Sequence, residues 1–581
     1  MVKALFENGR KLLYSKQANI LSAAVIIMIM VAASRVLGLI RYRTFVHFFP
    51  PEQLDTFLAA FQLPDMIFEI LILGAMSSAF IPVFTKYLAK GEDKEAWNVA
   101  GMTLNAMFLF FLIFSAVIFV FAHPIYSIIA KGFTPEQITQ TVSFTRILLI
   151  AQMFFIASYH LTAVLESNQR FLISSFAPLF YNLGIIVSTY FLAPTLGLFA
   201  PVLGVVIGSA MHLLIQLPLA LSLGFKPIFS LNFANPGVRS IMKLALPRIV
   251  ELSFLQIKRF TDLFIASLVV GGLTYFKFGD SLAALPVGLF GLSIAKASFP
   301  QLSRLASTKD MEGFKVMFAS SFREILFLVL PISVFLTVLR VPIVRLAFGA
   351  DQFDWLDTVQ TGYVLSAFTI GAVSYALSLL ISRAFYALQD TTTPVKVSIL
   401  NILLNSGFGA LFILVFKLPI WGLALSYSVA GTVQLIILFV LLGKKVGGLG
   451  KLGIGGTLSK VFVAASSSGA SMFILLKILD RSVWDKKLSF LGQIGLGLPT
   501  TFDKFVLDTR YTLNLILITA FVAFVGAAIY LLISYLLKVE ELNLIIKAFK
   551  KLSLSRFMQG PKAEPELKEA EIVATQPTNG V

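Results

Sequence analysis

The sequence contains no cysteine and only four histidines among its 581 residues. Without cysteine, the chain has no disulfide bonds, thiolate catalysis or cysteine-ligated metal centres. The histidines are widely scattered and lack metal-ligand spacing; they are His47, His123, His160 and His212. Charged residues make up only 13% of the chain, whereas 57% is hydrophobic and the mean hydropathy is +0.87. This composition excludes an ordinary water-soluble protein of this length.

Long apolar runs are what the sequence does contain. Many of them reach about 20 residues, the length that a helix needs to cross a bilayer. We predict about fourteen such helices from the order of these runs. Their ranges are 20–48, 57–88, 98–122, 138–166, 171–193, 197–222, 240–270, 276–304, 315–339, 360–388, 393–416, 419–443, 458–479 and 511–537. The sequence therefore predicts an all-α polytopic membrane protein.

The formal net charge is +17, and its placement along the chain is informative. Basic residues gather in the N-terminal segment, in alternate loops and in the tail. The loops include Lys86, Lys90, Lys94, Lys309, Lys315, Lys444 and Lys445. The positive-inside rule then places both termini in the cytoplasm. We interpret the basic loops as topology signals and as contacts with anionic membrane lipids, and we expect no binding of nucleic acid.

A weak internal repeat organises the chain. Residues 165–188 and 385–408 each contain a helix end, a polar turn, a proline and a helix with an asparagine. Repeats that flank a site at mid-membrane are typical of alternating-access transporters, although any two membrane hairpins share some of these features. The predicted divisions are a cytoplasmic segment (1–19), two six-helix lobes (20–222 and 238–443), a helix pair (455–538) and a cytoplasmic tail (539–581), basic at first and then disordered.

Three arginines, Arg35, Arg41 and Arg43, lie in "SRVLGLIRYR" at the end of the first apolar run. Ionisable side chains within a membrane span usually face a water-filled cavity and mark the substrate path. Arg35 and Arg41 are six positions apart, about 120° around a helix, so both can border one broad cavity. The alternative is that Arg41 and Arg43 extend to the external membrane interface.

Five stretches together resemble the MurJ (MviN) family. They are "SRVLGLIRYR", "DTFLAAFQLPD", "GAMSSAFIPVF", "LPVGLFGLSIAKASFPQLSR" and "RAFYALQDTTTPVK", and the resemblance extends over residues 20–445. These proteins are lipid II flippases of the multidrug/oligosaccharidyl-lipid/polysaccharide exporter superfamily. The resemblance implies a monomeric fourteen-helix bundle that moves lipid II, an undecaprenyl-pyrophosphate-linked cell-wall precursor, across the bacterial cytoplasmic membrane by alternating access. It also implies that the last two helices form a groove for the lipid tail.

We predict a set of substrate-binding positions, some implied by the resemblance, such as Arg35 and Arg41, and others supplied by charged or polar residues particular to this chain. They are Arg35, Arg41, Asp55, Gln62, Asp65, Glu69, Lys258, Arg259, Asp280 and Ser281. The chain departs from the family because Tyr42 replaces an aspartate, and Phe68 and Ser281 replace basic residues. We expect Lys258 or Arg259 to supply the missing positive charge, since a buried diphosphate must be paired. Otherwise the protein moves a different substrate.

Asp262 is, by the same resemblance, a candidate ligand for a coupling monovalent cation. The alternative is a structural ion pair, because Lys258 and Arg259 precede Asp262 by four and three positions on one helix face. The membrane potential is the other candidate energy source, and we expect no cofactor. Asp390 in "QDTTTP" is predicted to be a turn residue.

Two other functions remain open. One is export of another polyprenyl-linked glycan or of a drug. The other is an integral-membrane glycan ligase or polymerase, which would need convergent acid–base or metal-binding residues; the sequence contains no such cluster.

Overall fold

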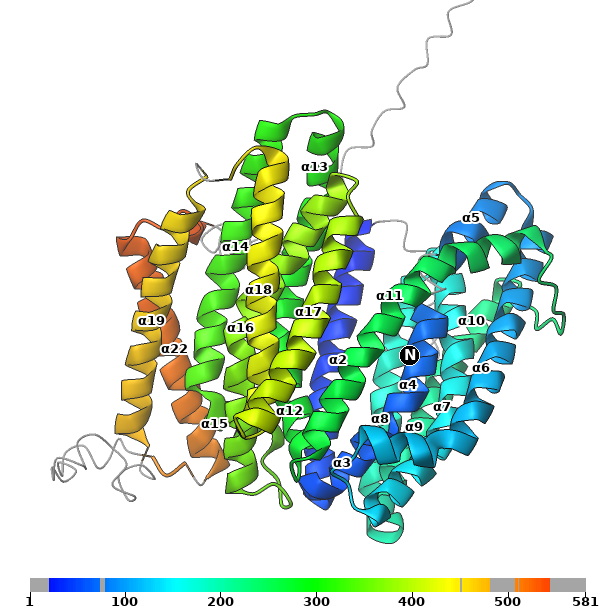
Figure 1. The fold of residues 1–581 in the computed structure, drawn as a ribbon, viewed down its shortest axis with the longest axis horizontal. Coiled ribbons are helices and arrows are strands. Elements are labelled where there is room, and N and C mark those ends of the chain that lie inside the picture. The colour runs from blue at the N-terminus through cyan, green and yellow to red at the C-terminus, as the bar shows by residue number, and fades with distance from the viewer. Residues whose placement is uncertain (1–19, 74–78, 450–451, 481–506, 510, 544–581) are drawn as a thin grey trace, which may run out of the picture.

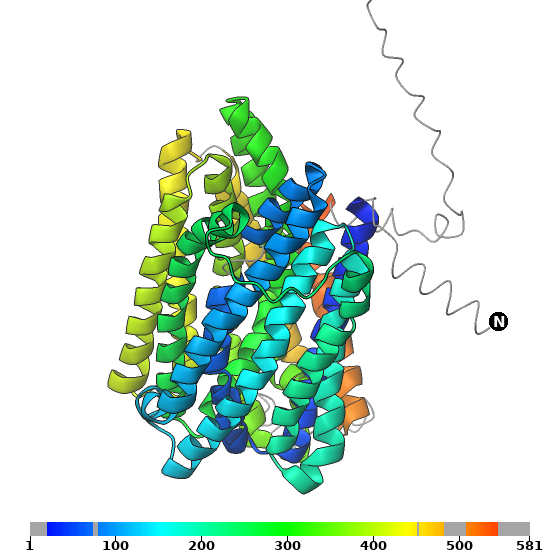
Figure 2. The same cartoon turned by 90° about the vertical axis from the view of Figure 1, so that its right-hand side faces the viewer.

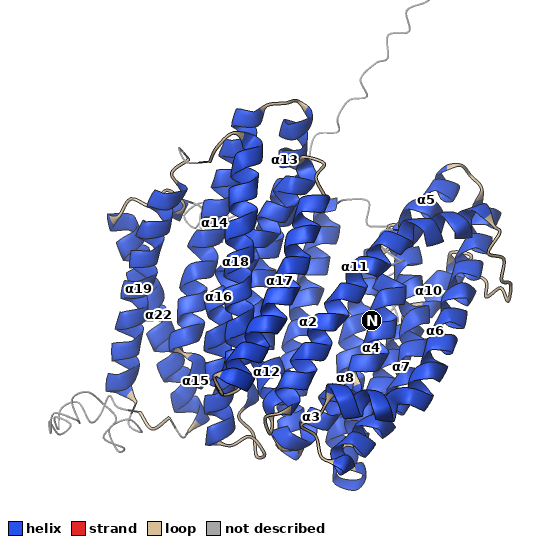
Figure 3. Cartoon of the chain, in the orientation of Figure 1, coloured by secondary structure: helices blue, strands red, loops and turns tan. Residues whose placement is uncertain are grey.

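The computed structural model describes residues 20–73, 79–449, 452–480, 507–509 and 511–543. Long helices run roughly parallel to one another in these residues (Figures 1 and 2). Within the described ranges there is no strand, only an isolated bridge between Asp480 and Leu507 (Figure 3). The prediction of an all-α protein is confirmed.

The structure describes ten helical elements in the first half of the chain. They are α2 (Ile20–Phe48), α3 (Pro51–Ala60), α4 (Gln62–Phe68), the π-helix η1 (Glu69–Leu73), α5 (Ile81–Ala89), α6 (Asp93–Ile129), α7 (Pro135–Ser167), α8 (Phe171–Leu196), α9 (Phe199–Leu214) and α10 (Leu217–Ser222). We call α2–α10 the first half below.

The remaining elements follow after a connecting segment. They are α11 (Pro236–Ser267), α12 (Gly272–Pro286), η3 (Val287–Gly291), α13 (Leu292–Ser307), α14 (Met311–Val338), α15 (Arg340–Phe348), α16 (Trp355–Ala387), α17 (Thr392–Ala410), η4 (Leu411–Val415), α18 (Trp421–Val446), α19 (Ile454–Leu479) and α22 (Thr512–Leu536). We call α11–α18 the second half and α19 with α22 the helix pair.

Eleven helices of the described part are long and apolar enough to cross a membrane, so the chain is a multi-pass membrane protein. The other three predicted spans are helical but are not among the eleven. They correspond to α2, to the short helices described within 51–73 and 79–89, and to α11, which contains several charged residues. The predicted total of fourteen therefore stays a prediction.

Local sequence signals fix several helix starts. Asp390 is an example, because its Oδ1 accepts a hydrogen bond of 3.0 Å from the amide of Thr393, in the first turn of α17. Lys445 at the end of α18 lies 2.6 Å from Asp390 Oδ2. This hydrogen bond from Lys445 keeps the pKa of Asp390 below its usual range. The prediction that Asp390 is a turn residue is confirmed.

The hydrophobic core connects the two halves at one end of the bundle, where α3 and α15 lie (Figure 1). There Phe45 and Phe57 belong to the same buried cluster as Phe278 and Phe348. A second cluster, which includes Leu302 of α13, contains residues of the second half and the helix pair alone. The α13–α14 part of the second half therefore packs on the helix pair and not on the first half.

Polar contacts reinforce this junction, which we call the α3–α15 end. Asp55 of α3 is 2% exposed, and its Oδ1 accepts hydrogen bonds from the amide (2.8 Å) and hydroxyl (2.7 Å) of Thr274. The amide of Gln352 donates to the carbonyl oxygen of Val46 at 3.0 Å. Thr274 lies in the first turn of α12, so a carboxylate of the first half caps a helix of the second.

Close helix contacts depend on glycine where α8 crosses α9. A Cβ added at Gly184 would lie 2.6 Å from the Cα atom of Gly208. We expect Gly184→Ala to lower the free energy of unfolding by about 1–3 kcal/mol, because the backbone of α9 must move away. Thermal unfolding in detergent measures this change. The control is Gly407→Ala, where nothing lies within 4 Å of the added Cβ. Equal melting temperatures for both variants would contradict the packing.

Candidate substrate cavity

A pocket of about 290 Å³ lies between the two halves, beside α2, α4, α8 and α12. Its lining is aromatic and charged. It consists of Arg41, Tyr42, Phe45, Phe57, Leu58, Phe61, Asp65, Tyr181, Ile185, Val205 and Lys277. The structure therefore brings together Arg41 and Asp65, which the sequence singled out, with Lys277 from the second half.

Arg41 contributes a positive charge that forms no ion pair with any described residue. Its guanidinium lies over the rings of Tyr42 and Tyr181, at 5.0 and 5.9 Å from their centroids. Its Nε is buried without a hydrogen-bond partner, and among the described residues no carboxylate lies within 4.0 Å of it. Cation–π contacts hold a cation in place while leaving its N–H groups available. Arg41 is therefore positioned to bind an anion.

Three of the predicted substrate-binding residues, Gln62, Asp65 and Glu69, form a polar stripe on α4 and η1. Asp65 Oδ1 accepts a 2.7 Å hydrogen bond from Gln152 Nε2 of α7. Gln62 Nε2 is buried and has no partner within the described residues. Glu69 begins the π-helix η1. In this stripe, Asp65 thus accepts a hydrogen bond, whereas the Gln62 amide is free to donate one.

Glu69 connects the halves through an ion pair. Its Oε1 lies 2.8 Å from Arg259 Nη1, and Gln256 Nε2 donates to its Oε2 at 3.3 Å. Both partners belong to α11. The Arg259 side chain is 39% exposed, so solvent screens this pair and its contribution to stability is small.

Asp262 forms the ion pair that was the alternative to cation binding. Lys258 Nζ lies 2.6 Å from Asp262 Oδ2, and the ammonium is 5.1 Å from the ring centroid of Tyr427. The part of the chain that the structure describes contains no group of three or more acidic or histidine side chains close enough together to hold a metal ion. A coupling cation at Asp262 stays a prediction, and it requires Lys258 to move away.

The other predicted residues lie around this centre. Arg35 is exposed on α2 and faces η3, where a Cβ added at Gly288 would be 3.2 Å from its Nη2. Asp280 is half-buried on α12, and its carboxylate interacts electrostatically with the charges of Lys277 and Lys258. The hydroxyl of Ser281 donates to the carbonyl oxygen of Phe278 in its own helix, at 2.7 Å. Asp55 does not line the pocket, because it caps α12.

Aromatic contacts occupy positions where the family resemblance implies charge. Tyr42 packs on Phe278 of the second half with ring centroids 4.8 Å apart. Phe68 packs on Tyr159 and Phe155 of α7 at 5.1 and 5.9 Å. Apolar ring contacts between helices have replaced charge at both positions.

Lys277 is a residue of the site that the sequence analysis did not identify. Lys277 precedes Asp280 by three positions, so both project from one side of α12. This spacing in the sequence could have indicated that Lys277 lies in the site with Asp280. The sequence contains no such signal for Gln152 and Tyr181, whose positions depend on how α7 and α8 pack on α4 and α2.

The helices and the pocket together define a class of protein. Two sets of membrane helices, which meet at the α3–α15 end and along α11, enclose a pocket with charged residues from both halves. This arrangement is that of a helical membrane transporter.

Solved structures share this fold. A lipid II flippase MurJ in an inward closed conformation superposes with a TM-score of 0.68 at 23% identity, covering 88% of this chain and 98% of that chain. A multidrug resistance MATE family transporter of the MOP superfamily, in an inward-facing conformation, gives 0.63 at 13% identity over 72% and 96% of the two chains. At these identities the likeness concerns the fold alone.

Sequence comparison identifies the family. The probable lipid II flippase MurJ of Vibrio cholerae is 27% identical over 509 residues, 83% of this chain and 95% of that protein. The corresponding Buchnera aphidicola protein is 28% identical over 429 residues, 72% and 83% of the two chains. Residues 47–493 match the family described as lipid II flippase MurJ. The chain belongs to this family.

The ion pair between Lys258 and Asp262 generates a stability prediction. The two side chains are only 18% and 13% exposed, so Asp262→Asn leaves a cation with little solvent. We expect a loss of about 3 kcal/mol for this single change. The double variant Lys258→Met/Asp262→Asn should be more stable than Asp262→Asn alone, because no unpaired charge remains. Thermal unfolding of the wild type and these two variants tests this, and a double variant that is less stable than Asp262→Asn would contradict the pairing.

Proposed function

We propose that this protein flips lipid II across the bacterial cytoplasmic membrane for peptidoglycan synthesis. One observation carries the proposal within this family. Arg41 from the first half and Lys277 from the second half line one pocket, and among the described residues neither has a carboxylate within 4.0 Å. A flippase breaks no bond, so this function needs charge recognition and a change of conformation rather than catalytic groups.

The chemistry of the pocket suits a diphosphate. Such a group carries about two negative charges, and burying an unpaired ion costs several kcal/mol. Arginine offers planar, permanently charged donors for phosphate oxygens, and lysine adds a point charge. A diphosphate between Arg41 and Lys277 would be paired by both halves at once, so substrate binding would favour their approach.

Lys277 modifies the expectation drawn from the sequence, which assigned the compensating charge to Lys258 or Arg259. In this conformation Lys258 is paired with Asp262 and Arg259 with Glu69. We propose that Lys277 supplies the compensating cation here. Arg259 becomes available to the substrate only when Glu69 is released, as separation of the halves would do.

We propose alternating access between the lobes 20–222 and 238–443, with the α3–α15 end outside the cell. The predicted topology places both termini in the cytoplasm, and the buried junction at Asp55 and Thr274 then closes the external side. The helix pair within 455–538 is proposed to hold the lipid tail, in a protein that works as a monomer. The membrane potential or a monovalent cation is the proposed energy source.

A second candidate is export of another polyprenyl-linked glycan. The carboxylates of Asp65 and Asp280 lie near the pocket cations, and the family's basic positions are Phe68 and Ser281 here. This lower positive charge would suit a substrate with a single phosphate.

Complementation of a bacterium depleted of its own lipid II flippase tests the proposed function. We expect Arg41→Ala and Lys277→Gln each to abolish or strongly impair growth at normal protein levels, because each removes a charged contact worth roughly 2–5 kcal/mol. The matched control is Lys131→Gln, which removes an exposed cation from the loop between α6 and α7. Normal growth with Arg41→Ala and Lys277→Gln would argue against the assignment.

Cysteine labelling tests the orientation, and the absence of native cysteine makes the assay clean. Glu92→Cys and Asp310→Cys lie in loops predicted to be cytoplasmic, whereas Lys131→Cys lies in a loop predicted to be external. We expect a membrane-impermeant maleimide to label only residue 131 in intact spheroplasts. Labelling at residue 92 or 310 before lysis would overturn the topology.

A further inference from the structure

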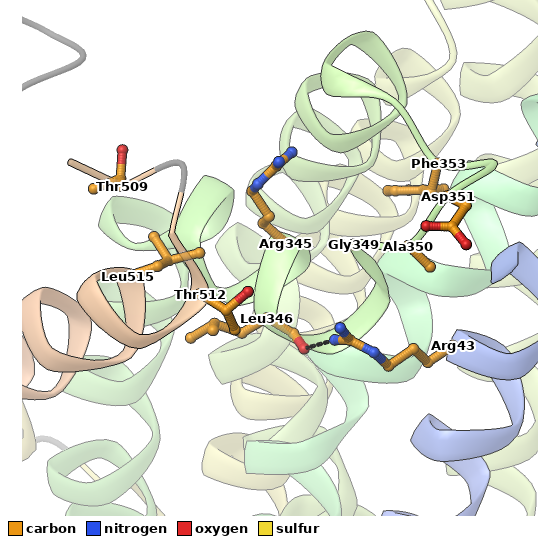
Figure 4. Close-up of a pocket in the computed structure, with 10 residues that line it drawn as sticks. All are labelled: Arg43, Arg345, Leu346, Gly349, Ala350, Asp351, Phe353, Thr509, Thr512 and Leu515. Carbon is orange, nitrogen blue, oxygen red and sulfur yellow. Dashed lines mark hydrogen bonds between the residues drawn. The ribbon is translucent and has the colours of Figure 1, made fainter.

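A second pocket, of about 230 Å³, lies at the α3–α15 end where three parts of the molecule meet (Figure 4). Helix α2 contributes from the first half, α15 with its following loop from the second half, and α22 from the helix pair. The lining residues are Arg43, Arg345, Leu346, Gly349, Ala350, Asp351, Phe353, Thr509, Thr512 and Leu515. The pocket is separate from the cavity that contains Arg41.

The charge of this pocket is positive on balance. Arg43 Nη1 donates to the carbonyl oxygen of Leu346 at 2.7 Å, which positions the guanidinium without neutralising it. Arg345 is partly buried and has no ion pair with any described residue. Asp351 is the one carboxylate of the lining, and its Oδ2 lies 2.8 Å from His47 Nδ1. The lining therefore contains two arginines and one carboxylate that already has a partner.

The start of α22 adds hydrogen-bond donors. This helix has 25 residues and begins at Thr512, and its N-cap residue Tyr511 makes no side-chain capping bond. The first amide N–H groups of a helix lack partners within the helix, and they lie at the positive end of its dipole. In Figure 4, Thr512 and Arg43 lie on either side of Leu346. The pocket thus combines two guanidinium groups, a helix start and a hydroxyl.

We propose that this pocket binds the phosphate group of a membrane lipid. Arginine pairs and helix starts are the groups that bind phosphate in proteins. The end of α2 and the start of α22 are also ends of predicted membrane spans, so the pocket lies at the depth of the lipid headgroups. The volume accommodates a phosphate together with the adjoining part of its headgroup.

Binding there has a conformational consequence. Arg43, Arg345 and Thr512 belong to the first half, the second half and the helix pair, so one phosphate would connect all three. It would stabilise the conformation in which the α3–α15 end is closed. This inference does not depend on which substrate the protein carries.

Two lipids could supply the phosphate, a resident anionic phospholipid or the diphosphate of a polyprenyl lipid. The purified full-length chain in maltoside detergent is titrated with phosphatidylglycerol, with undecaprenyl pyrophosphate and with a neutral diacylglycerol, and its melting temperature is measured. The variants are Arg43→Gln/Arg345→Gln and the matched control Arg340→Gln. Arg340 is another arginine of α15, and it does not line the pocket.

The expected result is stabilisation by at least one phosphate lipid and not by diacylglycerol. The double variant should need a roughly tenfold higher lipid concentration for half the effect, equivalent to about 1.4 kcal/mol, while Arg340→Gln behaves as the wild type. Stabilisation by phosphatidylglycerol assigns the site to resident phospholipid, and stabilisation by undecaprenyl pyrophosphate alone assigns it to a polyprenyl lipid. No stabilisation, or an equal response of the double variant and the wild type, overturns the proposal.

Discussion

The arrangement of the two halves depends on the hydrogen bonds that the carboxylate of Asp55 accepts. This carboxylate is buried at the end of one half and accepts both hydrogen bonds that Thr274 offers at the start of α12 in the other. A buried carboxylate needs such donors, because an unsatisfied one is costly. The surrounding phenylalanines exclude water and join the halves at this end, and α11 also packs on the first half, whereas α13 and α14 belong to a separate hydrophobic cluster.

The charges between the halves divide into two groups with different roles. Lys258 and Arg259 are matched with Asp262 and Glu69, and they add little net charge. Arg41 and Lys277 line the pocket without such partners among the described residues. An ionisable group within a membrane protein is retained when it pairs or when it binds a substrate. The unpaired group is therefore the better indicator of the transported anion, and its two members come from different halves.

The sequence predicted much of the fold because its signals are local. Apolar runs gave the helices, and the spacing of Lys258 and Asp262 indicated the ion pair that the structure contains. The contact between Glu69 and Arg259 joins residues 190 positions apart in the sequence, so no local sequence pattern predicts it. Lys277 was not predicted, because its position in the pocket depends on how α12 packs against α3. Tyr42 and Phe68 fit aromatic clusters that only the packed helices reveal.

The central claim is that a pocket with one unpaired cation from each half carries a diphosphate-linked lipid across the membrane. Translocation by the purified chain in proteoliposomes tests it most directly, with fluorescent lipid II compared with the same glycan on a polyprenyl monophosphate. The account predicts that the chain moves lipid II faster than protein-free liposomes and moves the monophosphate lipid much more slowly. Equal rates for the two lipids, or faster movement of the monophosphate lipid, would contradict it.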